Sequence, residues 1–235
     1  MFGRWLGDLL GIATIKQQLH SSRAGALWST VGLGVVVSVC APCNNGWMSQ
    51  LESDFKSRFA RAVTGHADTF GGRDLITLAH WSSKVALLLQ VQLAGMGEAT
   101  HIPQGHLSQL PTRTPLGTRV WVGTYAPMMR PVFWQGIPMS PANLPLDPDA
   151  PRLGYLMLIT IGSLLIVVLS LEDLGDEAFD TEGLPRTAFR PVWPLPSGTL
   201  KWPDGLILND NGLATFWPPT RFAVRANPRP SRHRV

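Results

Sequence analysis

The sequence predicts an α+β protein in which a small N-terminal module precedes a larger domain of helices and antiparallel strands. Three observations support this class. Apolar residues recur at helical spacing through residues 46–62 and 75–93. Alternating or β-branched apolar runs follow at residues 118–125 and 154–171, which is typical of strands. The chain also holds 20 prolines and 23 glycines, which indicates many turns and short elements.

The composition is that of a globular chain with a small positive charge. Of the 235 residues, 45% are hydrophobic, enough to bury a core, and only 15% are charged. The formal net charge is +4, and the excess of arginine over lysine is not by itself a nucleic-acid signal. No P-loop, nucleophile elbow or dinucleotide-binding glycine pattern occurs in the sequence. Charged residues interrupt the apolar pattern of residues 1–20, so we expect a cytoplasmic protein without a secretory signal.

The elements predicted before the cysteines are a helix and a strand. Residues 2–20 place their large apolar side chains on one face, which predicts an amphipathic helix. Residues 21–34 are small and contain glycine, which predicts a loop or one arm of a hairpin. The valine-rich run Val35–Val39 predicts a strand that leads directly into the first cysteine.

Both cysteines lie in one Cys40-x-x-Cys43 string. Two cysteines three residues apart are more typical of a metal or redox site than of a structural disulfide. A strand, a cysteine knuckle and a helix in this order make the second half of a treble-clef zinc module, in which two more ligands must come from elsewhere. His20 and His66 are the nearest candidates for the third zinc ligand. Two alternatives stay open, a pair of buried reduced thiols without metal and a redox-active pair.

Two helices are predicted after the cysteines. The chain is expected to turn at Asn44-Asn45-Gly46 and to continue as helix 46–62, with large apolar residues inward. The outer, solvated face of that helix is expected to hold Glu52, Asp54, Lys56 and Arg58. The second helix covers residues 75–93, with Asp74 as its N-cap, and its length and apolar weight predict the central helix of the fold.

Shorter elements follow the central helix. Gln104–Leu110 predicts a short helix between two prolines, and the alternating run Thr118–Tyr125 predicts a strand. Val132–Trp134 is expected to pair with that strand. Pro138–Pro151 contains five prolines and predicts a loop.

The apolar run 154–171 has two interpretations. It contains no charge over 18 residues, and as a helix it would extend roughly 27 Å, close to the bilayer core of about 30 Å. Alternatively, Gly162-Ser163 forms the two-residue turn of a buried hairpin over residues 154–170. Turn chemistry and β-branching favour the hairpin, so membrane anchorage through 154–171 is the less favoured interpretation.

The C-terminal third combines an acidic segment, tryptophan–proline pairs and a basic tail. Residues 172–182 carry six acidic residues, which predicts a solvated loop. Residues 221–235 contain no acidic residue, which predicts a disordered tail. Arginine can hold the phosphate backbone of DNA. The candidate nucleic-acid-binding residues are Asn44, Asn45, Arg221, Arg225, Arg229, Arg232 and Arg234.

The cysteine string also resembles a known family. Cys-x-x-Cys-Asn-Asn-Gly-Trp-Met-x-x-Leu-Glu at residues 40–52 is similar to the signature of bacterial proteins, frequent in actinobacteria, that are related to HNH endonucleases. The segments 78–86, 117–125, 160–164 and 192–194 resemble further motifs of that family. The resemblance covers most of residues 1–217, and it implies zinc and DNA as cofactor and partner.

The chain departs from that family at its start. The family pattern has a first Cys-x-x-Cys and a Glu-His pair, and Met1–Leu6 resembles only the segment that comes after them. HNH chemistry uses the missing histidine as the general base and a metal ion to offset charge on the leaving oxygen. We therefore expect no DNA cleavage by this chain. One hypothesis is that the reading frame begins upstream and that Met1 is a GUG codon read as the initiator.

These expectations combine into one organisation. Residues 1–62 form an HNH-like treble-clef remnant, residues 63–220 form an α+β domain around helix 75–93 and hairpin 154–170, and residues 221–235 form the basic tail. The expected function is that of a nucleic-acid-associated protein of HNH descent without activity. The alternatives are a binding or scaffold protein with a structural metal site, and a single-span membrane protein.

Overall fold

A computed structural model describes residues 4–11, 14–18, 27–31, 37–95, 97, 100–127, 132–139, 154–172, 180–182, 184–216 and 223–225. The helices are α1 (Arg4–Leu10), α2 (Ala41–Cys43), η1 (Asn44–Met48), α3 (Ser49–Val63), α4 (Gly72–Gly95), α5 (His106–Gln109) and α6 (Asp210–Phe216). The strands are β1 (Thr14–Gln18), β2 (Leu27–Val31), β3 (Asp68–Phe70), β4 (Thr118–Tyr125), β5 (Val132–Met139), β6 (Gly154–Ile161), β7 (Leu164–Leu171), β8 (Asp180–Glu182), β9 (Arg190–Trp193), β10 (Leu200–Trp202), β11 (Ile207–Leu208) and β12 (Ala223–Arg225). The α+β class is confirmed.

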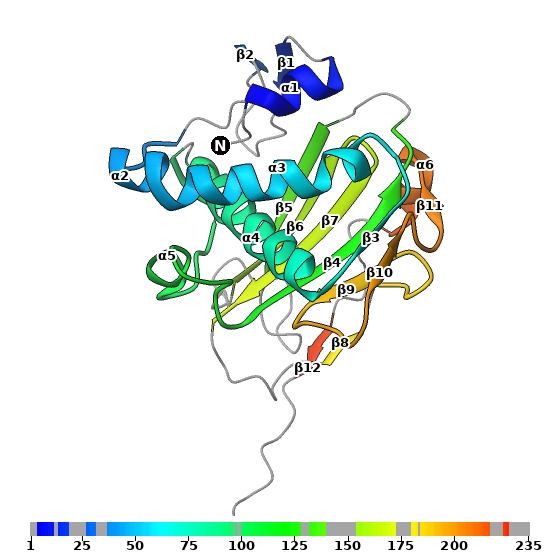
Figure 1. Ribbon diagram of the computed structural model, residues 1–235. Helices are drawn as coiled ribbons and strands as arrows, with labels where there is room; N and C mark the ends of the chain where they lie inside the picture. The colour runs from blue at the N-terminus through cyan, green and yellow to red at the C-terminus, as the bar shows by residue number, and fades with distance from the viewer. Residues whose placement is uncertain are drawn as a thin grey trace, which may run out of the picture.

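One six-stranded sheet organises the molecule. Its central path runs β11-β4-β7-β6-β5, and β9 pairs with β4 beside β11. All of these pairings are antiparallel except that of β11 with β4. Helices α3 and α4 cross one face of this sheet, while α6 and β11 lie at one edge (Figure 1).

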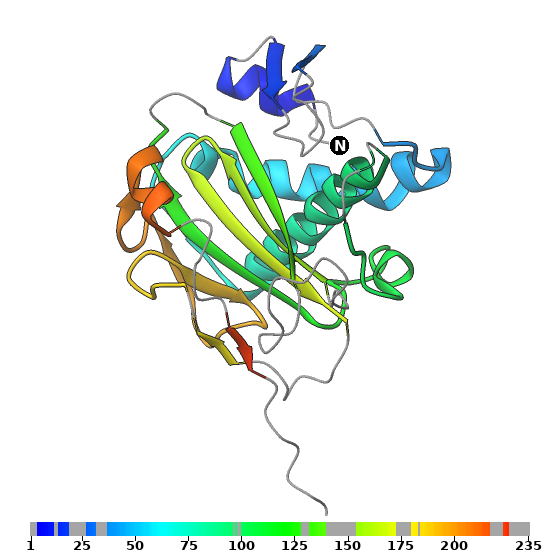
Figure 2. The ribbon, with the colours of Figure 1, turned by 180° about the vertical axis from the view of Figure 1, so that it is seen from behind.

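The two faces of the central strands belong to two different cores. On β6, Tyr155, Met157 and Ile159 pack into the core that contains α3 and α4. Leu156 and Leu158, which alternate with them, pack into the core on the other face. Figure 2 shows the ribbon from that side of the sheet. An antiparallel strand with one solvated face alternates apolar and polar residues. Because both faces are buried here, the run is apolar throughout.

The hairpin prediction for residues 154–170 is therefore confirmed. Strands β6 and β7 pair antiparallel from Gly154↔Leu171 to Ile161↔Leu164. Gly162 occupies the turn with a φ of +55°, a conformation that glycine adopts without strain. Within the part of the chain that the structure describes, no helix has both the length and the apolar character needed to cross a bilayer. The membrane-helix interpretation of 154–171 is wrong.

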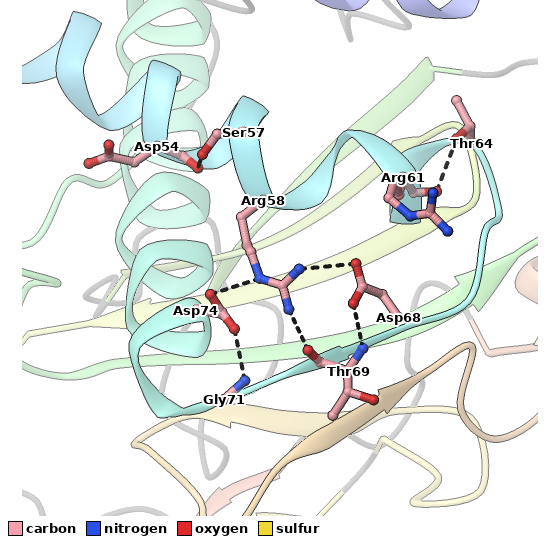
Figure 3. Close-up of polar contacts among 9 residues, drawn as sticks. All are labelled: Asp54, Ser57, Arg58, Arg61, Thr64, Asp68, Thr69, Gly71 and Asp74. Atoms are coloured by element: carbon pink, nitrogen blue, oxygen red, sulfur yellow. Dashed lines mark hydrogen bonds and ion pairs between the residues drawn. The ribbon is translucent and has the colours of Figure 1, made fainter.

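An arginine of α3 forms ion pairs with both β3 and the first turn of α4. The Arg58 guanidinium of α3 lies 3.0 Å from Asp68 Oδ2 of β3 and 2.9 Å from Asp74 Oδ1 of α4, and it also donates to the Thr69 carbonyl (Figure 3). Helix α4 contains the predicted range 75–93 but begins at Gly72, so Asp74 is not its N-cap. Asp74 instead accepts the Gly71 N–H from within the first turn, as in one half of a capping box.

Several N-terminal expectations are wrong. The helix predicted over residues 2–20 ends at Leu10, because Gly11 adopts a φ of +65°, and strand β1 follows. Residues 37–39 of the predicted strand 35–39 are irregular, and residues 35 and 36 lie outside the described residues. The cysteines then start a helical segment instead of a strand-to-helix corner, so a treble-clef remnant is not shown in the described residues.

Two expectations about the later segments are also corrected. Strand β5 pairs with β6 and not with β4, because β7 occupies one edge of β4 and β9 and β11 occupy the other. Residues 180–182 of the predicted acidic loop form β8, which pairs with β12 from the predicted disordered tail. That part of the tail is therefore ordered as a strand.

Candidate functional site

The cysteine pair lies at the start of the helical segment that leads into α3. Cys40 and Cys43 form a disulfide with a Cα–Cα distance of 5.2 Å, and the backbone N–H of Cys43 donates to Cys40 Sγ. The expectation that this spacing disfavours a disulfide is wrong, because one helical turn brings the two Cα atoms within the usual disulfide range. Cys40 is exposed and Cys43 is half-buried, so the alternative of buried thiols is also wrong.

The structure does not bring the predicted third zinc ligand to this pair. His66 lies beyond the C-terminal end of α3, a 15-residue helix that spans about 22 Å. Its Nδ1 is 2.8 Å from Thr64 Oγ1. His20 lies outside the described residues. Among the residues that the structure describes, no three His, Cys, Asp or Glu side chains are grouped to hold a metal, and zinc stays a prediction.

The predicted nucleic-acid-binding residues separate into two sets. Asn44 and Asn45 follow the disulfide in η1, are exposed, and share a hydrogen bond from Asn44 Nδ2 to Asn45 Oδ1 of 3.4 Å. The expected turn at these residues is instead a helical turn with a kink at Gly46, whose φ and ψ are −95° and −114°. Arg225 ends β12 opposite Asp180. The remaining arginines lie outside the described residues: Arg221, Arg229, Arg232 and Arg234.

Asn44 and Asn45 line a cleft between α1, η1, α3 and α4. Its volume is about 350 Å³. Two lysines, one glutamate, two amides and two serines supply its polar groups. The lining residues are Trp5, Asn44, Asn45, Met48, Ser49, Glu52, Ser53, Lys56, Lys84 and Leu88. The cleft is therefore the place where the predicted asparagines meet charged side chains from two helices.

Glu52 of α3 is the acceptor at the floor of this cleft. Its Oε1 accepts the Trp5 Nε1–H of α1 at 3.0 Å, and its Oε2 accepts the Trp81 Nε1–H of α4 at 2.8 Å. The Lys84 ammonium lies 2.6 Å from the same Oε2. The expectation that Glu52 lies on a solvated face is wrong: its side chain is only 14% exposed. A buried carboxylate needs such partners, since burial without them is costly.

The Lys84 side chain is the most deeply buried charge of the cleft. It is 3% exposed, and its Nζ lies 5.6 Å from the centroid of the Trp81 ring. Burial lowers the pKa of the Lys84 ammonium, and the charge and hydrogen bond of Glu52 oppose that shift. The ammonium and the carboxylate, 2.6 Å apart, offset one another's charge within the cleft.

Lys56 is the other cation of the cleft, and it is exposed. Its Nζ lies 5.9 Å from the centroid of the Trp5 ring. No carboxylate of the described residues forms an ion pair with it. Lys56 therefore supplies the net positive charge of the cleft, beside a ring that the Trp5–Glu52 hydrogen bond holds in place.

An aromatic stack supports the cleft from inside the core. Phe55 stacks on Trp81 with ring centroids 3.7 Å apart, and Trp5 lies 6.3 Å from Phe55.

A second aromatic pair lies outside the cleft. Trp47 stacks on His80, whose Nε2 is 2.7 Å from the Leu110 carbonyl. A carbonyl only accepts, so His80 Nε2 carries the proton. Burial lowers the pKa of His80.

The sequence patterns did not predict that Glu52 and Lys84 pair with one another and line the cleft. A helical pattern assigns charged residues to the solvent face, and it places Glu52 there by default. The available signal was Trp81 followed by Lys84 on an otherwise apolar helix, because the two positions lie on one face. A buried lysine on a central helix requires an acidic partner from a neighbouring element, and Glu52 lies on the adjacent helix.

No protein-family model, curated protein sequence or solved structure matches the chain. The relation to HNH endonucleases accordingly stays an expectation drawn from the residues at 40–52. Any function assigned to the chain therefore depends on the geometry of the cleft.

Proposed function

We propose that this chain is a nucleic-acid-associated protein of HNH descent that binds phosphate groups in the cleft and does not cleave the strand. One observation carries the proposal: the exposed ammonium of Lys56 shares a cleft with the amides of Asn44 and Asn45. Ammonium and amide N–H groups are donors that phosphate oxygens accept. The same asparagines were expected from the sequence to contact nucleic acid.

The charge of the cleft supports an anionic ligand. Glu52 and Lys84 cancel one another as an ion pair at 2.6 Å. Lys56 then leaves the lining residues with one net positive charge. A phosphodiester carries one negative charge, so one phosphate group balances the cleft.

The same geometry supports the absence of catalysis. Histidine does not occur among the described residues that line the cleft, and Glu52 is its carboxylate. Both oxygens of Glu52 already accept hydrogen bonds, from Trp5, Trp81 and Lys84. A general base must reach the proton of the attacking water, and an ion-paired carboxylate with two indole donors is poorly suited to that role.

The test is binding and cleavage of DNA by the full chain. We expect binding that weakens as salt rises, and no cleavage with Mg²⁺, Mn²⁺ or Zn²⁺. Lys56→Glu should weaken binding at least fivefold. Lys201→Glu is the matched control, since Lys201 is exposed on β10 and does not line the cleft. Equal effects of the two variants, or metal-dependent cleavage, would contradict the proposal.

A second candidate is a binding or scaffold protein with a structural zinc site. The observation that favours it is the adjacency of Cys40 and Cys43, which after reduction present two sulfur ligands from one turn. Metal analysis of the reduced full chain tests it, with Cys43→Ser as the matched variant. Zinc that is lost in Cys43→Ser, together with no DNA binding, would support this candidate over the first.

A further inference from the structure

We infer that the cleft takes one nucleotide unit of a single strand in preference to duplex nucleic acid. This inference rests on the proposed function and narrows its ligand. Three observations support it. The cleft is small, its Lys84 side chain is buried whereas Lys56 is exposed, and Trp5 forms one wall.

The size of the cleft limits what can enter. Its volume of about 350 Å³ lies at the low end for small-molecule sites, which hold about 300–1,000 Å³. Phosphates of a duplex are fixed along the outside of a rigid rod, so a duplex can only touch the rim. A single strand rotates about its backbone bonds and can turn one phosphate and its base inward.

The depth of the charged groups favours a group that enters. The Lys84 side chain lines the cleft and is only 3% exposed, whereas Lys56 and the two asparagines are exposed at its rim. A phosphate at the rim meets Lys56 and the asparagines. A phosphate turned inward also approaches the Lys84 ammonium, whose charge Glu52 offsets but which carries three N–H donors, so an inserted nucleotide reaches a donor group that a duplex does not.

Trp5 supplies the wall on which a base can stack. Its Nε1–H donates to Glu52 Oε1, which restrains the position of the indole ring. In the structure the Lys56 ammonium lies 5.9 Å from the centroid of that ring. When Lys56 moves onto a phosphate, the ring face it leaves becomes available to the base of the same nucleotide. Base–aromatic stacking is tolerant of sequence, so the preference would be for single strands of any sequence.

The asparagines complete the phosphate side of the site. Asn44 Nδ2 donates to Asn45 Oδ1, and this hydrogen bond uses the acceptor of the Asn45 amide and not its N–H donors. Amide donors suit phosphate and sugar oxygens and carry no base preference. The ligand is thus defined by one phosphate and one stacking base.

The experiment compares the full chain with a labelled 12-nucleotide oligothymidylate and a duplex of equal phosphate content, by fluorescence anisotropy. We expect the single strand to bind at least tenfold more tightly. Lys56→Met should remove that preference, and Lys201→Met should retain it. Trp5→Leu tests stacking, and dTMP and inorganic phosphate serve as competitors, with dTMP expected to compete at tenfold lower concentration or below.

The outcomes separate the inference from the proposed function. Equal binding of single strand and duplex, both weakened by Lys56→Met, would overturn the inference and leave the proposed function standing. Equal competition by phosphate and dTMP, with Trp5→Leu unchanged, would overturn the stacking base. No binding of either nucleic acid would overturn both proposals. Because Lys56 is exposed, its substitution is expected to leave the fold intact, which the circular dichroism spectrum checks.

Discussion

The Lys84 ammonium lies 2.6 Å from Glu52 Oε2, so a buried ion pair joins helix α4 to helix α3 beneath the cleft. Removing one partner of such a pair leaves the other charge buried and uncompensated. We predict that Lys84→Met lowers the free energy of unfolding by about 3–5 kcal/mol, measured by urea denaturation. The double variant Glu52→Gln/Lys84→Met should lose less than the sum of the single variants. Additive losses would show that the two side chains do not interact.

His80 is predicted to make the protein sensitive to acid. Its pKa is lowered in the folded state by burial, so between that folded pKa and the unfolded value of about 6.5 the unfolded chain binds more protons. The stability from His80 is therefore present above pH 6.5 and is lost as the pH falls through the folded pKa. His80→Gln should reduce the difference in unfolding free energy between pH 7 and pH 5. An unchanged difference would contradict the assignment.

Gly162 is predicted to tolerate no side chain. Its φ is +55°, and a Cβ would lie 2.1 Å from the Val63 carbonyl oxygen, which accepts the Ser163 N–H at 2.8 Å. Gly162→Ala should lower the unfolding free energy by about 2–4 kcal/mol, since strain and a backbone clash add. Gly95→Ala is the control. A Cβ there meets nothing within 4 Å, so that change should be neutral or slightly stabilising.

The Arg58 clamp of Figure 3 is predicted to depend on guanidinium geometry. One side chain bonds Asp68, Asp74 and the Thr69 carbonyl, which an ammonium cannot do at the same time. Arg58→Lys should therefore lower the unfolding free energy by about 1 kcal/mol, a modest loss because the groups are partly solvated. Thermal unfolding at low and high salt measures it, and a loss that is absent at low salt would contradict the prediction.

The disulfide is predicted to contribute little to stability. Cys40 and Cys43 are three residues apart, so the bond closes a very short loop. In the chain-entropy model its removal costs at most about 2 kcal/mol. Thermal unfolding with and without a phosphine reductant measures this, and Cys40→Ser/Cys43→Ser should match the reduced protein and not respond to reductant. A much larger loss would assign the pair a structural role.

The fold could be predicted where one local pattern decides the structure. Strand Thr118–Tyr125 has the predicted bounds, and the turn at Gly162-Ser163 identified the hairpin, because both signals are local. Partner choice is not local. Val132–Trp134 pairs with β6 since both edges of β4 are occupied by strands that come later in the chain.

The candidate site could be predicted only in part, for a related reason. The string Cys40–Asn45 indicated a ligand-binding segment, and Asn44 and Asn45 do line the cleft. The rest of the cleft forms only when α1, α3 and α4 meet. The sequence does not show that Glu52, outward by periodicity, lies under Trp5 and opposite Lys84. The valine run 35–39 likewise predicts a strand from its own composition. A strand also needs a partner strand, which the run itself does not reveal, and residues 37–39 are irregular.

The apolar hairpin, which is buried on both faces, also has a consequence for folding during translation. Residues 184–216 add Ala188, Phe189, Leu208 and Leu213 to the core on the face opposite α3 and α4. During synthesis, β6 and β7 leave the ribosome before this segment does. One apolar face of the hairpin is then uncovered and can associate with other chains. Chaperone contact during translation should peak in that interval and decline once residue 213 has emerged, and fragments that stop near residue 172 should aggregate.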